Sequence, residues 1–139
     1  VYAETGNYMH PQADYPDLAF VSMRFRNGAV GCLYSSTASA LGGTSGTVQG
    51  SDGAIRYNGW GKQGRIEWKR FDAEQPTAID LVELDYQPGV AYELQKFAEA
   101  ALTRTTPIVT GLDGLKVVEI ARAAYESATT GKRIELPVR

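Results

Sequence analysis

The segment 110–137 constrains the fold most, because it contains the signals that begin a helix, end it and follow it with an extended stretch. Thr110 and Asp113 form a Thr-x-x-acid pattern, whose side-chain oxygens accept hydrogen bonds from the first turn of a helix. Gly131 suits the left-handed conformation that ends a helix. We therefore expect a helix that begins after Thr110, ends before Gly131 and leads into a short strand over 134–136.

Apolar side chains within this helix recur at the spacing of one helical face. Residues three and four positions apart lie on the same side of a helix, so such a stripe is expected to face the core. The residues predicted to be buried in this way are Val117, Ala121, Ala124, Tyr125 and Ala128.

The segment 17–26 alternates between two faces, which is the pattern of a β-strand. Asn27 and Gly28 form the dipeptide preferred in two-residue hairpin loops, and such a loop would pair Phe25 with Val30. One face of the resulting hairpin mixes apolar and polar side chains and is suited to a subunit interface. We expect that face to contain Leu18, Phe20 and Leu33 beside Ser22, Arg24, Ser35 and Thr37.

Strands precede helices along this chain. Further short strands are expected at 1–4, 44–50, 54–58, 65–71 and 78–86. A helix over 90–104 should follow, with Leu94, Phe97, Ala98, Ala101 and Leu102 at core spacing. This order predicts an α+β fold: an open, mainly antiparallel sheet with helices packed on one face and the other face available for oligomerisation.

Length and composition fit a single domain over residues 1–139. Lys and Arg number 14 against 16 Asp and Glu, with no basic run, so nucleic acid is not an expected partner. Cys32 is the only cysteine, and its place in an apolar strand pattern predicts a buried thiol. No apolar run is long enough to span a membrane and no signal layout is present, so we expect no membrane partner and a cytoplasmic location.

The segment 59–64 satisfies the G-x-G-x-x-G pattern of dinucleotide-binding loops. In those loops the glycines lie between a buried strand and the start of a helix. Here a strand-like alternation begins at Arg65, so we expect a glycine-rich hairpin loop instead.

His10 is the only histidine and lies in a polar loop over 8–16. An imidazole can donate or accept a hydrogen bond near neutral pH, which makes His10 a candidate substrate contact. The alternative is a solvated loop histidine. Without a second histidine or a cysteine nearby, no metal site is expected.

Three stretches in order, 17–36, 47–55 and 110–137, carry a resemblance to a known family. The last reads TGLDGLKVVEIARAAYESATTGKRIELP, the middle one TVQGSDGAI, and the first contains a strand, an Asn-Gly turn and a second strand. Together they resemble the C-terminal domain of the Gfo/Idh/MocA family of NAD(P)-dependent oxidoreductases.

This resemblance implies a substrate-binding and oligomerisation domain of a sugar or polyol dehydrogenase. NAD or NADP and the catalytic residues would belong to an N-terminal Rossmann domain upstream of Val1, so this chain alone is expected to bind no cofactor and to be inactive. Its partners would be that domain, the substrate and further copies of the chain. In the family, substrate contacts often come from the loop after the hairpin and from the first long helix, which here correspond to Leu41, Gly42, Gly43 and Tyr92. The alternative is a freestanding α+β ligand-binding or scaffold module without redox activity.

Overall fold

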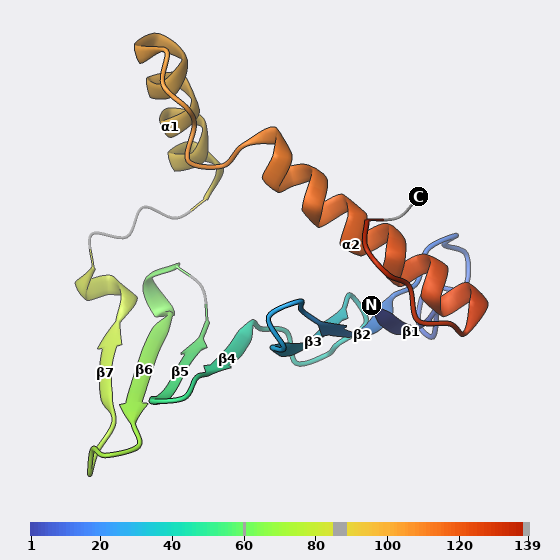
Figure 1. Cartoon of the computed structure of the whole chain (residues 1–139), viewed down its shortest axis with the longest axis horizontal. Coiled ribbons are helices and arrows are strands. Elements are labelled where there is room, and N and C mark those ends of the chain that lie inside the picture. The colour runs from blue at the N-terminus through green and yellow to red at the C-terminus, as the bar shows by residue number, and fades with distance from the viewer. Residues whose placement is uncertain (60, 85–88, 138–139) are drawn as a thin grey trace. The chain divides into compact units, whose positions relative to one another are not determined.

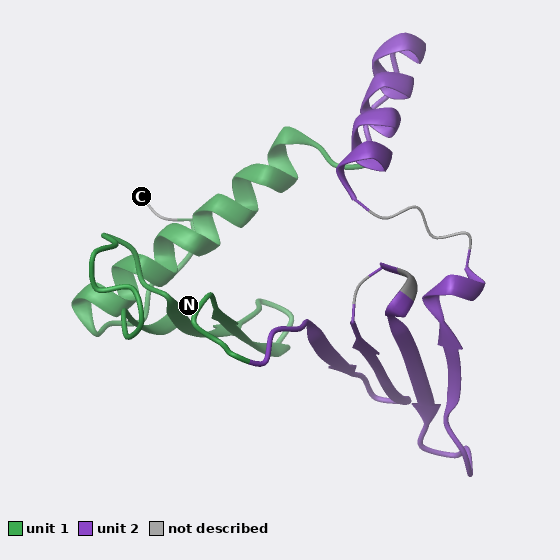
Figure 2. Cartoon of the chain, turned by 180° about the vertical axis from the view of Figure 1, so that it is seen from behind, with its two compact units in different colours: residues 1–40, 108–139 green, residues 41–107 purple. Residues whose placement is uncertain are grey.

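The computed structural model describes residues 1–59, 61–84 and 89–137. Within these residues it contains two open antiparallel sheets and two α-helices, which confirms the predicted α+β class (Figure 1). The strands form two sheets and not the single sheet that the sequence predicts: β1–β3 belong to one sheet and β4–β7 to the other. The chain groups into two compact units, Val1–Ala40 with Ile108–Arg139 and Leu41–Pro107 (Figure 2).

The first unit combines a three-stranded sheet with a long helix. Its strands are β1 (Tyr2–Gly6), β2 (Leu18–Arg24) and β3 (Val30–Ser36), and its helix is α2 (Gly111–Thr130). The strands are antiparallel, and α2 packs along β1 (Figure 1). Ala3, Val21 and Ala124 form a small buried apolar core between sheet and helix.

Helix α2 begins and ends where the sequence predicts. Thr110 Oγ1 accepts a hydrogen bond of 3.3 Å from the nitrogen of Asp113, while the Asp113 carboxylate accepts one of 3.0 Å from the nitrogen of Thr110. The Thr110 hydroxyl also donates to Asp113 Oδ2 at 2.7 Å, and this bond, together with the one from the nitrogen of Thr110, holds the pKa of Asp113 below its usual value. Gly131 ends the helix with a φ of 67°, a conformation that glycine adopts without steric cost.

The buried face of α2 differs from the predicted stripe. Val117 is 67% exposed and Tyr125 is 54% exposed, and of the five predicted residues only Ala124 is fully buried. The residues that face the strands are instead Ala123, Ala124 and Ser127. Small side chains let the helix approach β1 closely, and Ser127 supplies an oxygen to a buried main-chain nitrogen, so the helix is rotated from the orientation that would bury its largest side chains.

The outer edge of β1 is closed by α2 and the segment that follows it. The nitrogen of Ala3 donates to Ser127 Oγ, and Val1 and Ile134 exchange two main-chain hydrogen bonds of 2.7 and 2.8 Å. The prediction of a short strand over 134–136 is therefore wrong, because Val1 and Ile134 form a single residue pair that does not extend into a strand. Unpaired edge groups invite association with other chains, and this arrangement satisfies the main-chain groups of Val1 and the nitrogen of Ala3 internally.

The hairpin between β2 and β3 has a longer loop than predicted. The nitrogen of Phe25 donates to Ala29 O at 2.9 Å, and the nitrogen of Gly28 donates to Phe25 O at 3.0 Å. Gly28 has a φ of 90°, as in a three-residue loop in which a turn is followed by a glycine bulge. Val21 consequently pairs with Leu33, and the predicted register is wrong by one residue.

This shift moves each side chain of β3 to the opposite face of the sheet. Leu33 now lies on the face that α2 covers, and Tyr34 lies on the outer face opposite Phe20, with ring centroids 4.9 Å apart. Cys32 shares that outer face and is exposed, so the predicted buried thiol is wrong. We call the exposed side of the first sheet, with Tyr2, Phe20, Val30, Cys32 and Tyr34, the outer face.

The second unit contains a four-stranded sheet and a shorter helix. Its elements are β4 (Ser45–Gln49), β5 (Gly53–Asn58), η1 (Gly61–Gln63), β6 (Arg65–Arg70), β7 (Thr77–Asp80), η2 (Leu81–Glu83) and α1 (Val90–Thr103). The strand expected over 78–86 ends at Asp80 and is followed by a 3-10 helix, and Tyr86 lies outside the described residues.

The two faces of the second sheet differ sharply in polarity. Val48, Ile55 and Trp68 are aligned across three strands on one face. The other face carries Arg56 and Arg65, which both pair with the carboxylate of Glu67. The Arg56 guanidinium and, to a lesser extent, that of Arg65 hold the pKa of Glu67 below its usual value. This alternation is the expected signature of a sheet with one apolar face.

The larger apolar side chains of α1 are exposed, contrary to the predicted core. Leu94 and Phe97 are each 62% exposed, and only Ala100 is buried. Helical spacing determines which side chains share a face, but it does not supply the surface that covers them.

Candidate functional site

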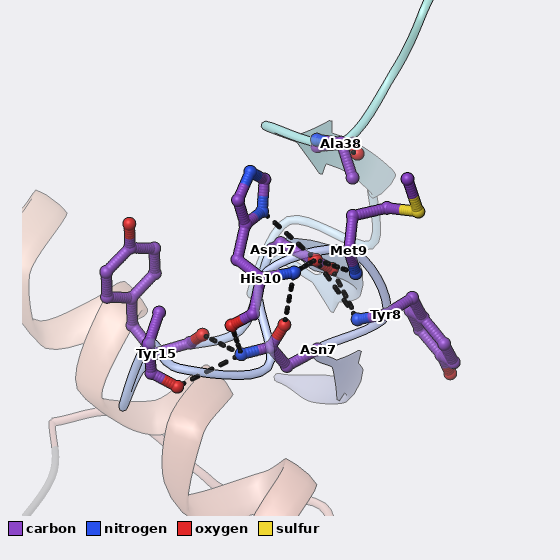
Figure 3. A network of polar contacts seen from close by, with 9 residues as sticks. Asn7, Tyr8, Met9, His10, Tyr15, Asp17 and Ala38 are labelled. Carbon is purple, nitrogen blue, oxygen red and sulfur yellow. Dashed lines mark hydrogen bonds and ion pairs between the residues drawn. The ribbon is translucent and has the colours of Figure 1, made fainter.

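Asp17 organises the loop between β1 and β2 (Figure 3). It is 1% exposed, and its carboxylate accepts main-chain hydrogen bonds from Met9 at 2.6 Å, from Tyr8 at 3.0 Å and from His10 at 3.2 Å. Burial by itself raises the pKa of Asp17, but the N–H groups of Met9, Tyr8 and His10 outweigh it and hold the pKa below its usual value. The buried carboxylate of Asp17 therefore fixes the main chain of residues 8–10 in this loop.

Asn7 holds the same loop from its other end (Figure 3). Its Nδ2 lies 2.7 Å from His10 O, 3.0 Å from Ala13 O and 3.2 Å from Tyr15 O. Its Oδ1 accepts a hydrogen bond of 3.1 Å from the nitrogen of His10. The main chain of the loop is thus fixed on both sides of His10.

The imidazole of His10 lies beside this network and contacts it through Asp17. Its Nδ1 lies 3.3 Å from Asp17 Oδ2, and the side chain is 48% exposed (Figure 3). With Asp17 ionised, the favoured tautomer carries its hydrogen on Nδ1, facing the carboxylate. The second ring nitrogen, Nε2, then points away from the network and is able to accept a hydrogen bond from a hydroxyl group.

A cavity of about 230 Å³ lies beside Asp17 in the first unit, next to α2. The residues that line it include Thr5, Ser35 and Tyr125, which carry hydroxyl groups, and the apolar Leu33. A lining that mixes hydroxyl and apolar groups suits a small polyol, because the hydroxyls exchange hydrogen bonds while the apolar groups contact C–H surfaces.

The other predicted site residues belong to the second unit, whereas His10 belongs to the first. Leu41 is 91% exposed, and Gly42 and Gly43 are exposed with open space where a Cβ would stand. Tyr92, in the first turn of α1, is 41% exposed, and Lys96 Nζ lies 5.5 Å from its ring centroid. All four of these positions in the second unit are accessible to solvent.

Sequence reasoning missed both Asn7 and Asp17. The available signal was the residue type: Asn and Asp accept main-chain hydrogen bonds in turns more readily than other side chains. The sequence pattern identifies Asp17 only as the first residue of the strand expected over 17–26. Its role depends on the main chain of 8–10 folding back onto it, which no periodicity encodes.

The glycine pattern over 59–64 connects β5 to β6, which are antiparallel neighbours. Gly59 and Gly61 have φ values of 80° and 59°, so the predicted hairpin loop is confirmed; Trp60 lies outside the described residues. Because no helix long enough to hold a pyrophosphate opens here, these residues do not fit a dinucleotide site.

Two further kinds of feature are missing from the part of the chain that the structure describes. No group of three or more His, Cys, Asp or Glu side chains is arranged to hold a metal ion there. No described helix has both the length and the apolar character needed to cross a bilayer.

Three solved structures share this fold. An aldose-aldose oxidoreductase from Caulobacter crescentus, complexed with glycerol, has 22% identity and a TM-score of 0.78 over 97% of this chain and 40% of its own. An oxidoreductase from Agrobacterium radiobacter, in complex with NAD+, L-tartaric acid and magnesium, has 24% identity and a TM-score of 0.77 over 96% and 42%. The WlbA dehydrogenase from Bordetella pertussis, in complex with NADH and UDP-GlcNAcA, has 23% identity and a TM-score of 0.71 over 99% and 38%.

The chain therefore spans about two fifths of the length of these proteins. A comparison with curated protein sequences gave no significant match. The model of the oxidoreductase family C-terminal alpha/beta domain, of the Gfo/Idh/MocA type, matches residues 1–136. The predicted resemblance is confirmed, and the chain belongs to the Gfo/Idh/MocA oxidoreductase family as its C-terminal domain.

Proposed function

We propose that this chain is the substrate-binding and oligomerisation domain of a dehydrogenase that oxidises a sugar or polyol with NAD or NADP. The family match over residues 1–136 carries this proposal. The related structures contain glycerol, tartaric acid or a UDP-sugar, all of which carry hydroxyl groups, and two of them contain NAD+ or NADH. A dehydrogenase that draws on the NAD(P) pool would act in the cytoplasm.

The nucleotide would be held by another domain of the same protein. This chain's own glycine pattern lies in a hairpin loop, which is unsuited to a pyrophosphate. The nicotinamide, when bound, accepts a hydride from an alcohol carbon. The role left to this domain is to bind the substrate and orient its hydroxyl groups.

His10 is the residue that we propose for this role. Asp17 orients its ring through Nδ1, and Asn7 fixes the main chain beside it. Nε2 would then accept a hydrogen bond from a substrate hydroxyl without rearrangement of the loop. In the second unit, Leu41, Gly42, Gly43 and Tyr92 remain proposed substrate contacts, and all four are exposed.

The outer face of the first sheet is the proposed oligomerisation surface. Phe20 and Tyr34 are 53% and 54% exposed and contact each other with tilted rings, and Val30 is 71% exposed. Exposed apolar clusters of this kind, bordered by polar groups such as that of Ser22, are typical of protein interfaces. A second copy of the chain would cover this face.

The test is hydride transfer by the full-length protein. NAD or NADP is offered with a panel of sugars and polyols, and reduced nicotinamide is followed by its ultraviolet absorbance. We expect turnover by the full-length protein and none by the 139-residue chain alone. If the full-length protein neither binds nucleotide nor turns over any substrate, the freestanding binding or scaffold module becomes the better assignment.

A further inference from the structure

Three arginines line one groove of the first unit. Arg24 ends β2, Arg26 lies in the turn before β3, and Arg133 follows α2, and all three border a groove of about 500 Å³. Arg24 and Arg133 also border an adjoining hollow of about 250 Å³. We call this region the arginine groove.

The arginine groove is separate from the His10 loop. β2 runs from Leu18, next to Asp17, to Arg24, so the two features lie at opposite ends of the same strand. The segment after α2 reaches the Arg24 end through the hydrogen bonds between Val1 and Ile134. The groove therefore does not depend on the role proposed for His10.

The charges of the arginine groove are not balanced within the described residues. Arg24, Arg26 and Arg133 are exposed, and none of them forms an ion pair or side-chain hydrogen bond with a described residue. Glu135 is the one carboxylate among the residues that line the groove. Among the side chains that line the groove, three guanidinium groups against one carboxylate leave an excess of two positive charges, in a chain whose net charge is -2.

The exposed arginines of the second sheet make a useful contrast. There Arg56, Arg65 and Arg70 each lie within 3.4 Å of a carboxylate oxygen. Arg104 and Arg122 are also exposed and form no ion pair with a described residue. The arginine groove therefore differs by gathering three such guanidinium groups in one hollow, not by their lack of a carboxylate partner. A cluster of unpaired guanidinium groups in a hollow is suited to an anion.

We propose that the arginine groove binds the phosphate or diphosphate group of a small molecule. Guanidinium groups present paired N–H donors that match the oxygens of a phosphate. A phosphate monoester carries nearly two negative charges near neutral pH, which balances the excess of two, whereas a single carboxylate would balance only half of it. Phe25 and Leu136 also line the groove and offer apolar surface to the remainder of such a ligand.

The test is calorimetric titration of the 139-residue chain with inorganic pyrophosphate at low ionic strength. We expect saturable binding that is about tenfold weaker in each of the variants Arg24→Gln and Arg133→Gln, because each removes charge-assisted hydrogen bonds. The matched control is Arg70→Gln, which removes the same charge from an exposed arginine of the second unit and should leave binding unchanged. Arg24→Lys keeps the charge without the paired donors and should also weaken binding.

Three results would overturn the proposal. The first is the absence of saturable binding by the wild-type chain, and the second is a loss of affinity in the Arg70→Gln control as large as that in the groove variants. The third is tighter binding of malonate, a dicarboxylate, than of pyrophosphate, which would assign the groove to carboxylates. Far-ultraviolet circular dichroism of each variant confirms that a loss of binding is local, since all the substituted side chains are exposed.

Discussion

The main-chain nitrogen of Ala3 donates a hydrogen bond of 3.0 Å to the hydroxyl oxygen of Ser127, and both residues are buried. The Ser127 hydroxyl in turn donates to Lys132 O at 2.6 Å. One small side chain thus joins the first strand, the last helix and the segment that follows it. A valine or leucine here would add apolar volume but leave two main-chain groups without this partner.

We expect Ser127→Ala to destabilise the first unit by about 1–3 kcal/mol, because it leaves a buried main-chain donor and an acceptor unsatisfied. Urea denaturation of the wild-type chain and the variant measures this difference. Thr129→Ala is the matched control, since it removes an exposed helical hydroxyl that bonds only to Tyr125 O. Equal effects of the two substitutions would contradict the role assigned to Ser127.

Asp17 should make stability depend on pH in the acid range. Its pKa is lower in the folded chain than the ordinary value of 3.8, so the carboxylate stabilises the fold above that value. This contribution is lost as the pH falls through the folded pKa. We expect Asp17→Asn to be less stable than wild type at neutral pH. The difference in the free energy of unfolding between the two proteins should become smaller below pH 3.8.

The measurement is urea denaturation of both proteins across the acid range. Asp14→Asn, which removes a carboxylate from an exposed position of the same loop, is the control and should not reproduce the difference at neutral pH. If the difference in the free energy of unfolding between wild type and Asp17→Asn stays constant through the acid range, the charge of Asp17 is not what stabilises the fold.

His10 should affect substrate use by the full-length protein. We expect His10→Phe to lower kcat/KM for the preferred sugar or polyol about tenfold, which corresponds to one lost hydrogen bond. Steady-state kinetics should show the loss mainly in KM, because the contact is proposed for binding. Tyr15→Phe, in the same loop, is the control, since only the main-chain oxygen of Tyr15 takes part in the network. Unchanged kinetics in His10→Phe would remove His10 from the site.

The outer face should control the association of chains. Phe20→Glu places a charge among exposed apolar side chains. Burying that charge against a second copy carries a desolvation penalty that exceeds the free energy gained from the contact. We expect this variant to be monomeric in sedimentation equilibrium, while wild type forms a dimer or larger oligomer. Leu41→Glu, at a leucine that is 91% exposed in the second unit, makes the same kind of change and should leave the oligomer intact. An unchanged oligomer in Phe20→Glu would place the interface elsewhere.

Local signals in the sequence predict most of the elements correctly. The cap at Thr110 and the stop at Gly131 depend on hydrogen bonds and backbone conformation within a few residues, so they are legible from residue types alone. The same is true of the strand alternation and of the hairpin loop over 59–64. The order of these local features also carries the family resemblance.

Other features depend on which surfaces meet. The register of β2 and β3 differs from the predicted one by one residue because the turn contains a glycine bulge, and this difference places Leu33 on the side of α2 and Cys32 on the outer face. The buried side of α2 was decided by the close approach to β1, which favours alanine and serine over Val117 and Tyr125.

The candidate site divides in the same way. The residue type of His10 marked it as a possible ligand contact, because an imidazole can donate and accept hydrogen bonds. Its orientation by Asp17 and Asn7 arises only when the loop folds back on a buried carboxylate. The sequence by itself determined the helix ends, the strands and the family, since these depend on local patterns. Tertiary structure decided the register, the buried helix face and the partner of His10, since these depend on contacts between segments that patterns along the chain do not relate.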